Sequence, residues 1–487
     1  MGAPELSRRR ERSVSRPLSM SRAAAVGVAA VALIASVGVA AASPGSASGQ
    51  TRLAAKGSST PLPSLGWALP AAPVGRQLGW LVGAVRRPPI PAAVLRAHFD
   101  AAFLEHVSPR TFNAALAGLH VGGAWRIVTL DATTSPGELA VSVLAGSTRF
   151  GVEISVDAKG LIDGLLVQPV PAVPSPPRSW QALDAKLSAL APDVGFEAAT
   201  LSSRGSCTSV HVLSPSTARP LGSLFKVFVL GALARAVRAG TLSWHESVAL
   251  QANLTSLPSG VLQVEPAGTA YTVAQYAELM ISSSDNTAAD RLAALVGRGA
   301  IEAQVRRWSS HVSLDTPFLR TREFFVLKYA DYPRYADAYL ALSPKARDGY
   351  LGRVVDKVSL SAIHLSQAEL VSPRQIDDIE WFASPSDLCR AFAGLYADAH
   401  GSSLTPIATA MSLSDGGLGL NPLTWPQVWF KGGSETGVLT LGFLARDRSG
   451  RVVVVVALLS NPRGSLDEAT VATELLSIVR GAFRLVD

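Results

Sequence analysis

The chain is poor in cysteine and in clustered histidine. Only Cys207 and Cys389 occur among 487 residues, which excludes a disulfide framework and a cysteine-based metal cluster. The two cysteines could form one disulfide if the protein lies outside the cell, but we favour two buried thiols. The eight histidines are dispersed and form no H-E-x-x-H or H-x-H pattern. We therefore expect no metal and no other cofactor.

Charge is also scarce once the first residues are set aside. Charged residues make up 17% of the chain, and its net charge is +7. Six arginines between residues 8 and 22, less Glu5 and Glu11, supply +4 of this and leave only +3. No Lys/Arg stripe or aromatic platform is present, so we expect no nucleic acid as partner. Hydrophobic residues at 48% suffice for two or three folded units.

The head of the chain has the pattern of an export signal. Arginines up to Arg22 precede an apolar run over residues 23–42, and Ala40 and Ala42 offer a cleavage site before Ser43. We predict a signal peptide over 1–42 and a protein that is secreted, periplasmic or held in the cell envelope. An uncleaved anchor is the alternative, and the export route stays open.

Composition and periodicity then predict a linker and a first folded unit. Residues 43–64 are rich in Ser, Pro, Gly and Ala and predict a flexible linker. Residues 65–172 show helical patterns and then strand patterns, which predicts a small α+β domain with an antiparallel meander. The Pro-dense segment 171–179 is the expected joint. The helical patterns lie at 75–86 and 92–107, and the strand patterns at 125–132, 137–146, 149–158 and 160–170.

A larger domain is predicted over residues 173–487. Its strand patterns lie near both ends and its helical patterns mostly between them, so the ends can pair in one antiparallel sheet beside a helical lobe. A cleft between sheet and lobe is where chemistry is expected. The strand patterns lie at 195–203, 208–214, 437–445 and 451–460, and the flanking helices at 180–191 and 467–483.

The first candidate catalytic pair is Ser223 and Lys226, in the sequence SLFK. The apolar run that follows predicts a buried helix opening at Ser223, and one helical turn places the two side chains next to each other. A serine hydroxyl is a poor nucleophile until a base takes its proton, which a desolvated lysine can do. Taken without the other motifs, a serine and a lysine at this spacing are expected by chance about twice in a chain of this composition.

The second motif is Ser284-Asp285-Asn286, between a predicted helix and another that begins at Thr287. Taken alone, it is explained by helix capping and a turn. In a catalytic interpretation, Ser284 relays a proton to the leaving group and Asn286 donates to a substrate amide. Asp285 would hold the loop.

The third motif is Lys431-Gly432-Gly433, which precedes a predicted strand. A Gly-rich strand start is usually structural, although its glycines let a ligand approach the backbone. In the catalytic interpretation, Lys431 at the strand edge binds a substrate carboxylate, and the backbone N–H groups of Ser223 and Ser434 form an oxyanion hole. S-x-x-K, S-D-N and a K-x-G motif in this order form one catalytic set.

With these motifs the chain resembles the serine β-lactamase and penicillin-binding-protein superfamily, in particular the class A β-lactamases. The stretches 280–292, 317–324 and 384–392 are similar to class A sequences too, and the resemblance covers about 180–487. It is closer to a two-domain subfamily typified by the β-lactamase-fold esterase of the clavulanic acid cluster. The resemblance implies an α+β, β-lactamase-like fold behind a smaller cone-like domain similar to steroid isomerases and cyclases.

Two departures from class A bear on activity. Gly432 stands where class A has Thr or Ser, which removes a hydroxyl that helps hold a substrate carboxylate. No E-x-x-L-N motif is found, and Glu369 and Glu380 are the nearest carboxylates, so the deacylating base is unassigned. Weak β-lactam hydrolysis, esterase action and a covalent trap all remain open.

We therefore expect a monomeric serine acyl hydrolase that forms an acyl-enzyme at Ser223 on β-lactams or related esters and amides. A D-Ala-D-Ala peptidase-like penicillin-binding protein, or a ligand-binding or sensor protein of this fold, are the alternatives. The expected partner is a small-molecule acyl substrate. The predicted catalytic residues are Ser223, Lys226, Ser284 and Lys431, and the predicted substrate-binding and oxyanion residues are Asn286, Gly433 and Ser434.

Overall fold

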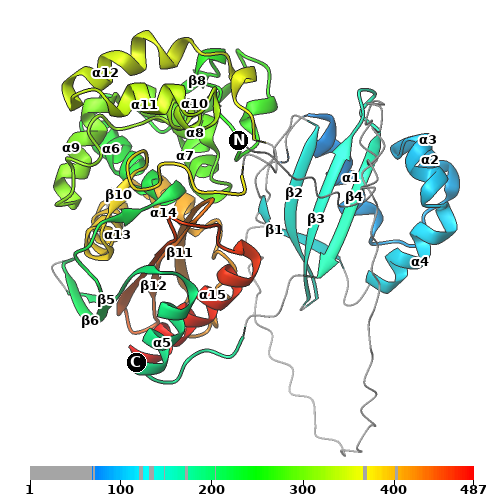
Figure 1. Ribbon diagram of the computed structural model, residues 1–487. Coiled ribbons are helices and arrows are strands. Elements are labelled where there is room, and N and C mark those ends of the chain that lie inside the picture. The colour runs from blue at the N-terminus through cyan, green and yellow to red at the C-terminus, as the bar shows by residue number, and fades with distance from the viewer. Residues whose placement is uncertain are drawn as a thin grey trace, which may run out of the picture.

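The computed structural model describes residues 69, 72–119, 124–130, 137–146, 148–169, 174–202, 205–365, 370–400 and 404–486. The predicted signal peptide and linker lie outside these ranges. The described residues form two α+β units that follow one another along the chain (Figure 1). Within them, no helix combines the length and the apolar character needed to cross a bilayer.

The smaller unit consists of helices followed by a four-stranded antiparallel sheet in the order β1-β2-β3-β4, as the meander pattern predicts. The predicted helix over 92–107 is two helices, because Asp100 accepts the N–H of Phe103 at 2.6 Å and caps a new start. A further helix, α4, was not predicted. The elements are α1 (Pro73–Ala84), α2 (Ala92–His98), α3 (Ala101–His106), α4 (Pro109–Leu119), β1 (Trp125–Leu130), β2 (Glu138–Ala145), β3 (Thr148–Val156) and β4 (Ile162–Pro169).

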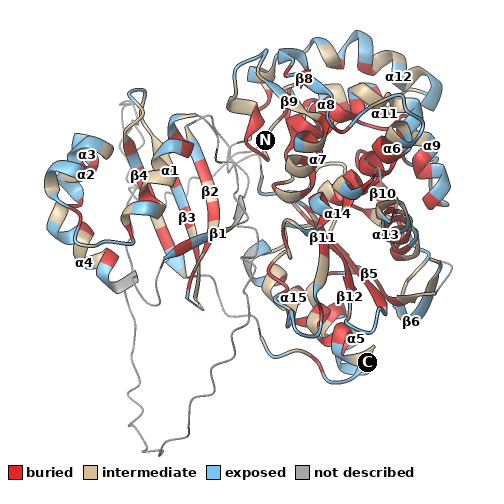
Figure 2. Ribbon diagram, turned by 180° about the vertical axis from the view of Figure 1, so that it is seen from behind, coloured by how far each residue is buried: buried red, intermediate tan, exposed pale blue. Residues whose placement is uncertain are grey.

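The two faces of this small sheet have different surroundings. Along β2, Leu139, Val141 and Val143 are buried, and they alternate with less buried residues such as Ser142. Because side chains alternate across a strand, Ser142 lies on the opposite face from this core row. In Figures 1 and 2 the sheet stands between α2–α4 and the larger domain.

The larger unit is built on a five-stranded antiparallel sheet in the order β11-β12-β13-β5-β6. Strands from both ends of the domain pair in it, as predicted, since β13 lies between β12 and β5. Every residue of β13 is buried: Val453 and Val455 pack toward α5 and α15, and Val454 and Val456 toward the helical lobe. The elements are α5 (Trp180–Leu190), β5 (Asp193–Leu201), β6 (Cys207–Leu213), β11 (Gln427–Glu435), β12 (Val438–Arg446), β13 (Val452–Ser460) and α15 (Glu468–Leu485).

The helical lobe is centred on α6, whose residues from Lys226 to Ala234 are all buried (Figure 2). A short two-stranded ladder, β7 with β10, ties the segment before Ser223 to the segment before α13. The elements are β7 (Arg219–Pro220), η1 (Gly222–Phe225), α6 (Lys226–Arg238), β8 (Ser247–Ala249), η2 (Ala252–Leu254), η3 (Leu262–Val264), β9 (Ala270–Thr272), α7 (Val273–Ser282), α8 (Asn286–Val296), α9 (Arg298–Trp308), α10 (Thr321–Tyr329), α11 (Arg334–Leu340), α12 (Pro344–Arg353), η4 (Val355–Lys357), η5 (Leu360–Ala362), β10 (Phe382–Ala383), α13 (Pro385–Ala399) and α14 (Thr405–Ser412).

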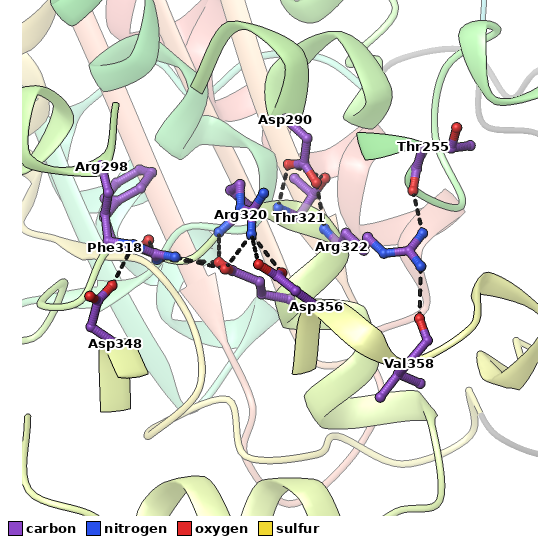
Figure 3. A network of polar contacts seen from close by, with 11 residues as sticks. Thr255, Asp290, Arg298, Phe318, Arg320, Thr321, Arg322, Asp348, Asp356 and Val358 are labelled. Carbon is purple, nitrogen blue, oxygen red and sulfur yellow. Dashed lines mark hydrogen bonds and ion pairs between the residues drawn. The ribbon is translucent and has the colours of Figure 1, made fainter. Parts of the chain in front are cut away.

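A buried polar network joins the start of α10 to α8 (Figure 3). Asp290 on α8 accepts the backbone N–H groups of Thr321 at 2.6 Å and Arg322 at 2.8 Å. Thr321 Oγ1 in turn lies 3.1 Å from the backbone oxygen of Asn286. The network thereby fixes the first turn of α8, which begins at Asn286 of the S-D-N motif.

The same stretch of α10 buries a charge at Glu323. Its carboxylate is fully buried and is paired with Arg298 at 2.7 Å and Arg320 at 2.8 Å. Burial alone would raise the pKa of Glu323, but the two arginines outweigh it and hold that pKa below its ordinary value. Arg320 also contacts Asp356, so the network reaches beyond α10 into η4 (Figure 3).

Cys207 and Cys389 form a disulfide, and our preference for two buried thiols was wrong. Helix α13 packs on the sheet beside β6 and brings the two Cα atoms to 6.3 Å, within bridging range. The bridge closes a separation of 182 residues along the chain. It therefore ties the start of the domain to helix α13, which packs against α6.

Replacing both cysteines by serine is expected to lower the free energy of unfolding by about 2–4 kcal/mol, because the bridge restricts the unfolded chain. Urea unfolding of the wild type and of the C207S/C389S variant, each with and without reductant, measures this. Reductant should destabilise only the wild type. Equal midpoints for wild type and variant without reductant would contradict the prediction.

Candidate active site

Ser223 lies in the 3-10 turn η1, so the α-helix predicted to open at Ser223 begins at Lys226 instead, and the two side chains still face each other as the spacing predicts. Lys226 Nζ is 3.2 Å from Ser223 Oγ, 2.6 Å from Asn286 Oδ1 and 2.5 Å from the backbone oxygen of Ser284. The lysine is fully buried, whereas Ser223 is half-buried. A buried amine thus contacts a hydroxyl that opens onto a cavity.

Burial lowers the pKa of Lys226 to about 7, although the negative charges of Asp285 and Asp290 act in the opposite direction. A lysine with that pKa is neutral in a large fraction of molecules near pH 7. In that form, its nitrogen can accept the proton of the serine hydroxyl.

Ser284 connects two lysines. Its Oγ lies 3.2 Å from Lys226 Nζ and 3.1 Å from Lys431 Nζ. Its backbone has φ = 56°, in the left-handed region that residues other than glycine seldom adopt. Strained backbone of this kind persists where the surrounding structure over-determines it. The arrangement suits the proton relay expected of Ser284.

Asp285 holds the S-D-N loop, as predicted. It is fully buried and accepts the backbone N–H groups of Val261 at 2.6 Å, Leu262 at 2.8 Å and Ala288 at 2.7 Å. It is the N-cap of α8. Its carboxylate thus joins the loop before the motif to the helix after it.

Asn286 is engaged on both sides of its amide group. Its Oδ1 accepts from Lys226, and its Nδ2 donates to the backbone oxygen of Leu257 at 2.7 Å. An amide nitrogen carries two N–H groups. Donation from the second to a substrate amide stays a prediction.

Lys431 lies in the middle of β11, which is the edge strand of the five-stranded sheet and was not itself predicted as a strand. Gly432 and Gly433 pair with Leu441 and Thr440 and continue the ladder, because their partner strand β12 satisfies their backbone. Lys431 is buried, and burial together with the charge of Lys226 holds its pKa well below the ordinary value. Two lysines this close do not both carry a full charge near neutral pH.

The backbone of β11 touches the nucleophile turn. A Cβ at Gly433 would lie 2.2 Å from the oxygen of Leu221 and 2.6 Å from the nitrogen of Ser223. Gly222 has φ = 50°, and its Cβ would lie 2.8 Å from the nitrogen of Ser434. Only glycines allow this approach, which brings the Ser223 and Ser434 N–H groups together as an oxyanion hole requires.

Phe430 fills the space beside Gly432. A Cβ at Gly432 would lie 2.8 Å from Phe430 Cζ, and one at Gly416, where φ is 56°, would lie 2.6 Å from Cε2 of the same ring. Phe430 also lines the cavity. The wall where a K-T-G motif carries a hydroxyl is therefore apolar here.

A cavity of about 630 Å³ lies over these groups. Its lining includes the turn at Ser223, the S-D-N loop, α10, β11 and the loop before Gly416. The small N-terminal domain contributes as well, through Ser142 and Arg149. The Arg149 guanidinium reaches that loop, since a Cβ at Gly417 would lie 2.5 Å from Arg149 Nη1.

Sequence reasoning placed most of the predicted residues but missed part of the lining. Ser223, Lys226, Ser284, Lys431, Asn286, Gly433 and Ser434 come together in one place. Of the two candidate carboxylates, Glu380 lines the cavity, and Glu369 lies outside the described residues. Nothing in the strand pattern singled out Arg149. Lys328, directly after the apolar run FFVL, and Glu435, directly after K-G-G-S, were signals that could have been followed.

The larger α+β unit, which holds the candidate site, and the smaller α+β unit before it each match a protein family. Residues 199–408 match the family described as "Beta-lactamase enzyme family". Residues 69–162 match the family described as "ORF 12 gene product N-terminal". The first match covers most of the larger unit, and these residues are similar to that family. No curated protein matches the chain.

The chain is also similar to several solved structures at low identity. A β-lactamase from Sphaerobacter thermophilus DSM 20745 is 19% identical, with 63% of this chain and 96% of that chain covered and a TM-score of 0.43. A β-lactamase from Chitinophaga pinensis DSM 2588 is 17% identical, with 62% and 97% covered and a TM-score of 0.43. A PBP-A structure, an acyl-enzyme complex with penicillin G, is 16% identical, with 63% and 99% covered and a TM-score of 0.40.

Proposed function

We propose that the protein is a serine hydrolase that forms an acyl-enzyme at Ser223 on β-lactams or related esters and amides. One observation carries the proposal. The Nζ of buried Lys226 lies 3.2 Å from both Ser223 Oγ and Ser284 Oγ. A base, a nucleophile and a proton relay are thereby in contact within a single site.

In this mechanism neutral Lys226 takes the proton of Ser223 Oγ while Oγ bonds to the acyl carbon. The N–H groups of Ser223 and Ser434 stabilise the oxyanion of the tetrahedral intermediate. When the intermediate collapses, its bond to the leaving group breaks. The proton then passes from Lys226 through Ser284 to that group, which balances the acylation step.

We propose esters and weakly held β-lactams as the substrates. Gly432 removes one hydroxyl from the carboxylate site, and the Phe430 ring makes that wall apolar. Both features disfavour tight binding of the penicillin carboxylate. A D-Ala-D-Ala peptidase or a sensor of the same fold would share the S-x-x-K and S-D-N residues, and product analysis separates these three.

We also propose that the chain belongs with the two-domain esterase-like proteins typified by the clavulanic acid cluster. The match of residues 69–162 to an ORF 12 N-terminal family favours this. We further propose that a signal peptide at residues 1–42 directs export of the protein. The disulfide between Cys207 and Cys389 agrees with an oxidising compartment. The protein would act as a monomer.

The test uses the chain from Ser43 onward with nitrocefin, p-nitrophenyl acetate and a D-Ala-D-Ala peptide. Absorbance and released D-Ala report turnover, and intact mass reports a covalent adduct. Serine-dependent ester or β-lactam turnover supports the hydrolase, and release of D-Ala supports the peptidase. An adduct without turnover supports a sensor. If neither an adduct nor turnover is observed, the assignment of Ser223 is contradicted.

Arg149 of the small domain is expected to select anionic substrates, because its guanidinium lines the cavity near the Gly417 loop. A charged hydrogen bond contributes about 1.5–3 kcal/mol, so Arg149→Ala should raise KM for a carboxylate-bearing substrate about tenfold or more. KM for neutral p-nitrophenyl acetate should stay unchanged. Arg126→Ala, in the same sheet but away from the cavity lining, is the matched control. Equal KM changes for both substrates would refute the role.

A further inference from the structure

Two carboxyl groups and a lysine lie together beside the nucleophile turn. Glu435 ends β11, and Lys328 lies on α10 with its Nζ 2.7 Å from both oxygens of Glu435. Glu380 precedes β10 and interacts electrostatically with both. All three are deeply buried: Lys328 is fully buried, Glu380 is 3% exposed, and 7% of the Glu435 side chain is exposed.

Glu380 is the member of this cluster that reaches the nucleophile segment. Its Oε2 accepts the N–H of Trp381 at 2.6 Å and that of Gly222 at 3.3 Å, and Gly222 directly precedes Ser223. Its Oε1 is buried and accepts no N–H among the described residues, and the Glu380 carboxyl shares a side-chain hydrogen bond with Glu435. Glu380 and Glu435 line the same cavity as Ser223. The Glu380 carboxyl therefore lies in the wall of the cavity that Ser223 also lines, one residue before the Trp381 backbone and in contact with the Gly222 N–H.

The charges of the cluster do not balance when both carboxyls are ionised. Lys328 neutralises Glu435, so an ionised Glu380 would be a second, unpaired negative charge in a buried site. Burial and the charge of Glu435 accordingly raise the pKa of Glu380 well above its ordinary value, against the opposing effect of Lys328. Tyr329 on α10 faces both carboxyls, and its own pKa is raised by burial. Arg374 stacks on that ring.

We propose that Glu380 is the general base that activates water against the acyl-enzyme, with Glu435 and Lys328 as positioning residues that set when Glu380 is ionised. This inference rests on the proposed function, because it needs an acyl group on Ser223. It assigns the deacylating base to a residue outside any E-x-x-L-N motif. It also makes the lifetime of the acyl-enzyme depend on pH.

The deacylation step balances with these groups alone. Ionised Glu380 takes a proton from water while the water oxygen bonds to the acyl carbon. The tetrahedral intermediate collapses, and the bond between the acyl carbon and Ser223 Oγ breaks. Glu380 returns the proton to Oγ, so the free serine and a carboxylic acid are formed. Because the ionised form is needed, deacylation accelerates as pH rises through the pKa of Glu380.

The first test compares wild type, Glu380→Gln and Glu197→Gln with p-nitrophenyl acetate, following intact mass after rapid quenching. In E380Q, acetylation of Ser223 should stay within about threefold of wild type, while loss of the acetyl group slows about 100-fold or more, as for loss of a general base. Glu197 is the matched control, since it is also buried but is bonded to Ser209 and Ser386. E197Q should deacylate like the wild type.

Glu435→Gln provides a second measurement that does not depend on removing the base. Loss of the neighbouring negative charge lowers the pKa of Glu380, so the rising limb of the deacylation rate should move to lower pH, by about one unit or more. An effect on folding alone would not move that limb. The proposal is overturned if E380Q deacylates at the wild-type rate. It is also overturned if the rising limb of the pH profile of deacylation stays at the same pH in E435Q. Absence of any Ser223-dependent adduct or turnover in the wild type overturns the proposed function instead.

Discussion

Ser223→Ala is expected to lose covalent labelling by p-nitrophenyl acetate and nitrocefin altogether, and to lose turnover by about 10³-fold or more. In the proposed mechanism, the acyl group is carried by Ser223 Oγ, while Lys226 only accepts its proton. Alanine has no atom that can replace Oγ. The removed group is one half-buried hydroxyl. The fold should therefore be unaffected.

The measurement is intact mass beside absorbance, with thermal unfolding as a check on the fold. Ser282→Ala is a suitable control, because Ser282 also lines the cavity but its hydroxyl bonds to the backbone oxygen of Glu278. That variant should label and turn over as the wild type does. Labelling of the Ser223→Ala protein at wild-type rate would mean that another residue is the nucleophile.

Lys226→Met is expected to slow acylation of Ser223 by about 10²–10⁴-fold, the range found for removal of a general base. Methionine fills much of the buried volume but cannot accept a proton. Since burial lowers the pKa of Lys226 to about 7, the wild-type acylation rate should rise with pH below about 7 and level off above it. The rate rises because the neutral amine, not the ammonium, is the base.

Stopped-flow acylation with p-nitrophenyl acetate between pH 5 and 9 tests both parts. Lys186→Met is the matched control, because Lys186 is 40% exposed in its side chain and pairs with Glu474 far along the chain. It should leave the profile unchanged. A Lys226→Met protein that keeps the wild-type rate and its rising limb would remove Lys226 from the mechanism.

Local sequence patterns predicted the elements with clear periodicity. The strands of the small meander and the valine-rich β13 were predicted because alternating or continuous apolar runs specify them. Helix α4 and strand β11 were not. The Gly432-Gly433 pair gives β11 little intrinsic strand preference, and its ladder with β12 stabilises it instead. Pairing across a sheet can override local propensity in this way.

The sequence by itself determined that Ser223 and Lys226 are in contact and that the S-D-N motif forms one loop, because each depends on spacing within one helical turn or one tight loop. Tertiary structure alone decided which distant residues join them. Glu380, Glu435 and Lys328 come from three separate elements, and Arg149 from another domain. The disulfide was decided in the same way, by α13 packing beside β6. No local pattern encodes these contacts, because they arise only when the buried faces of separate elements pack together.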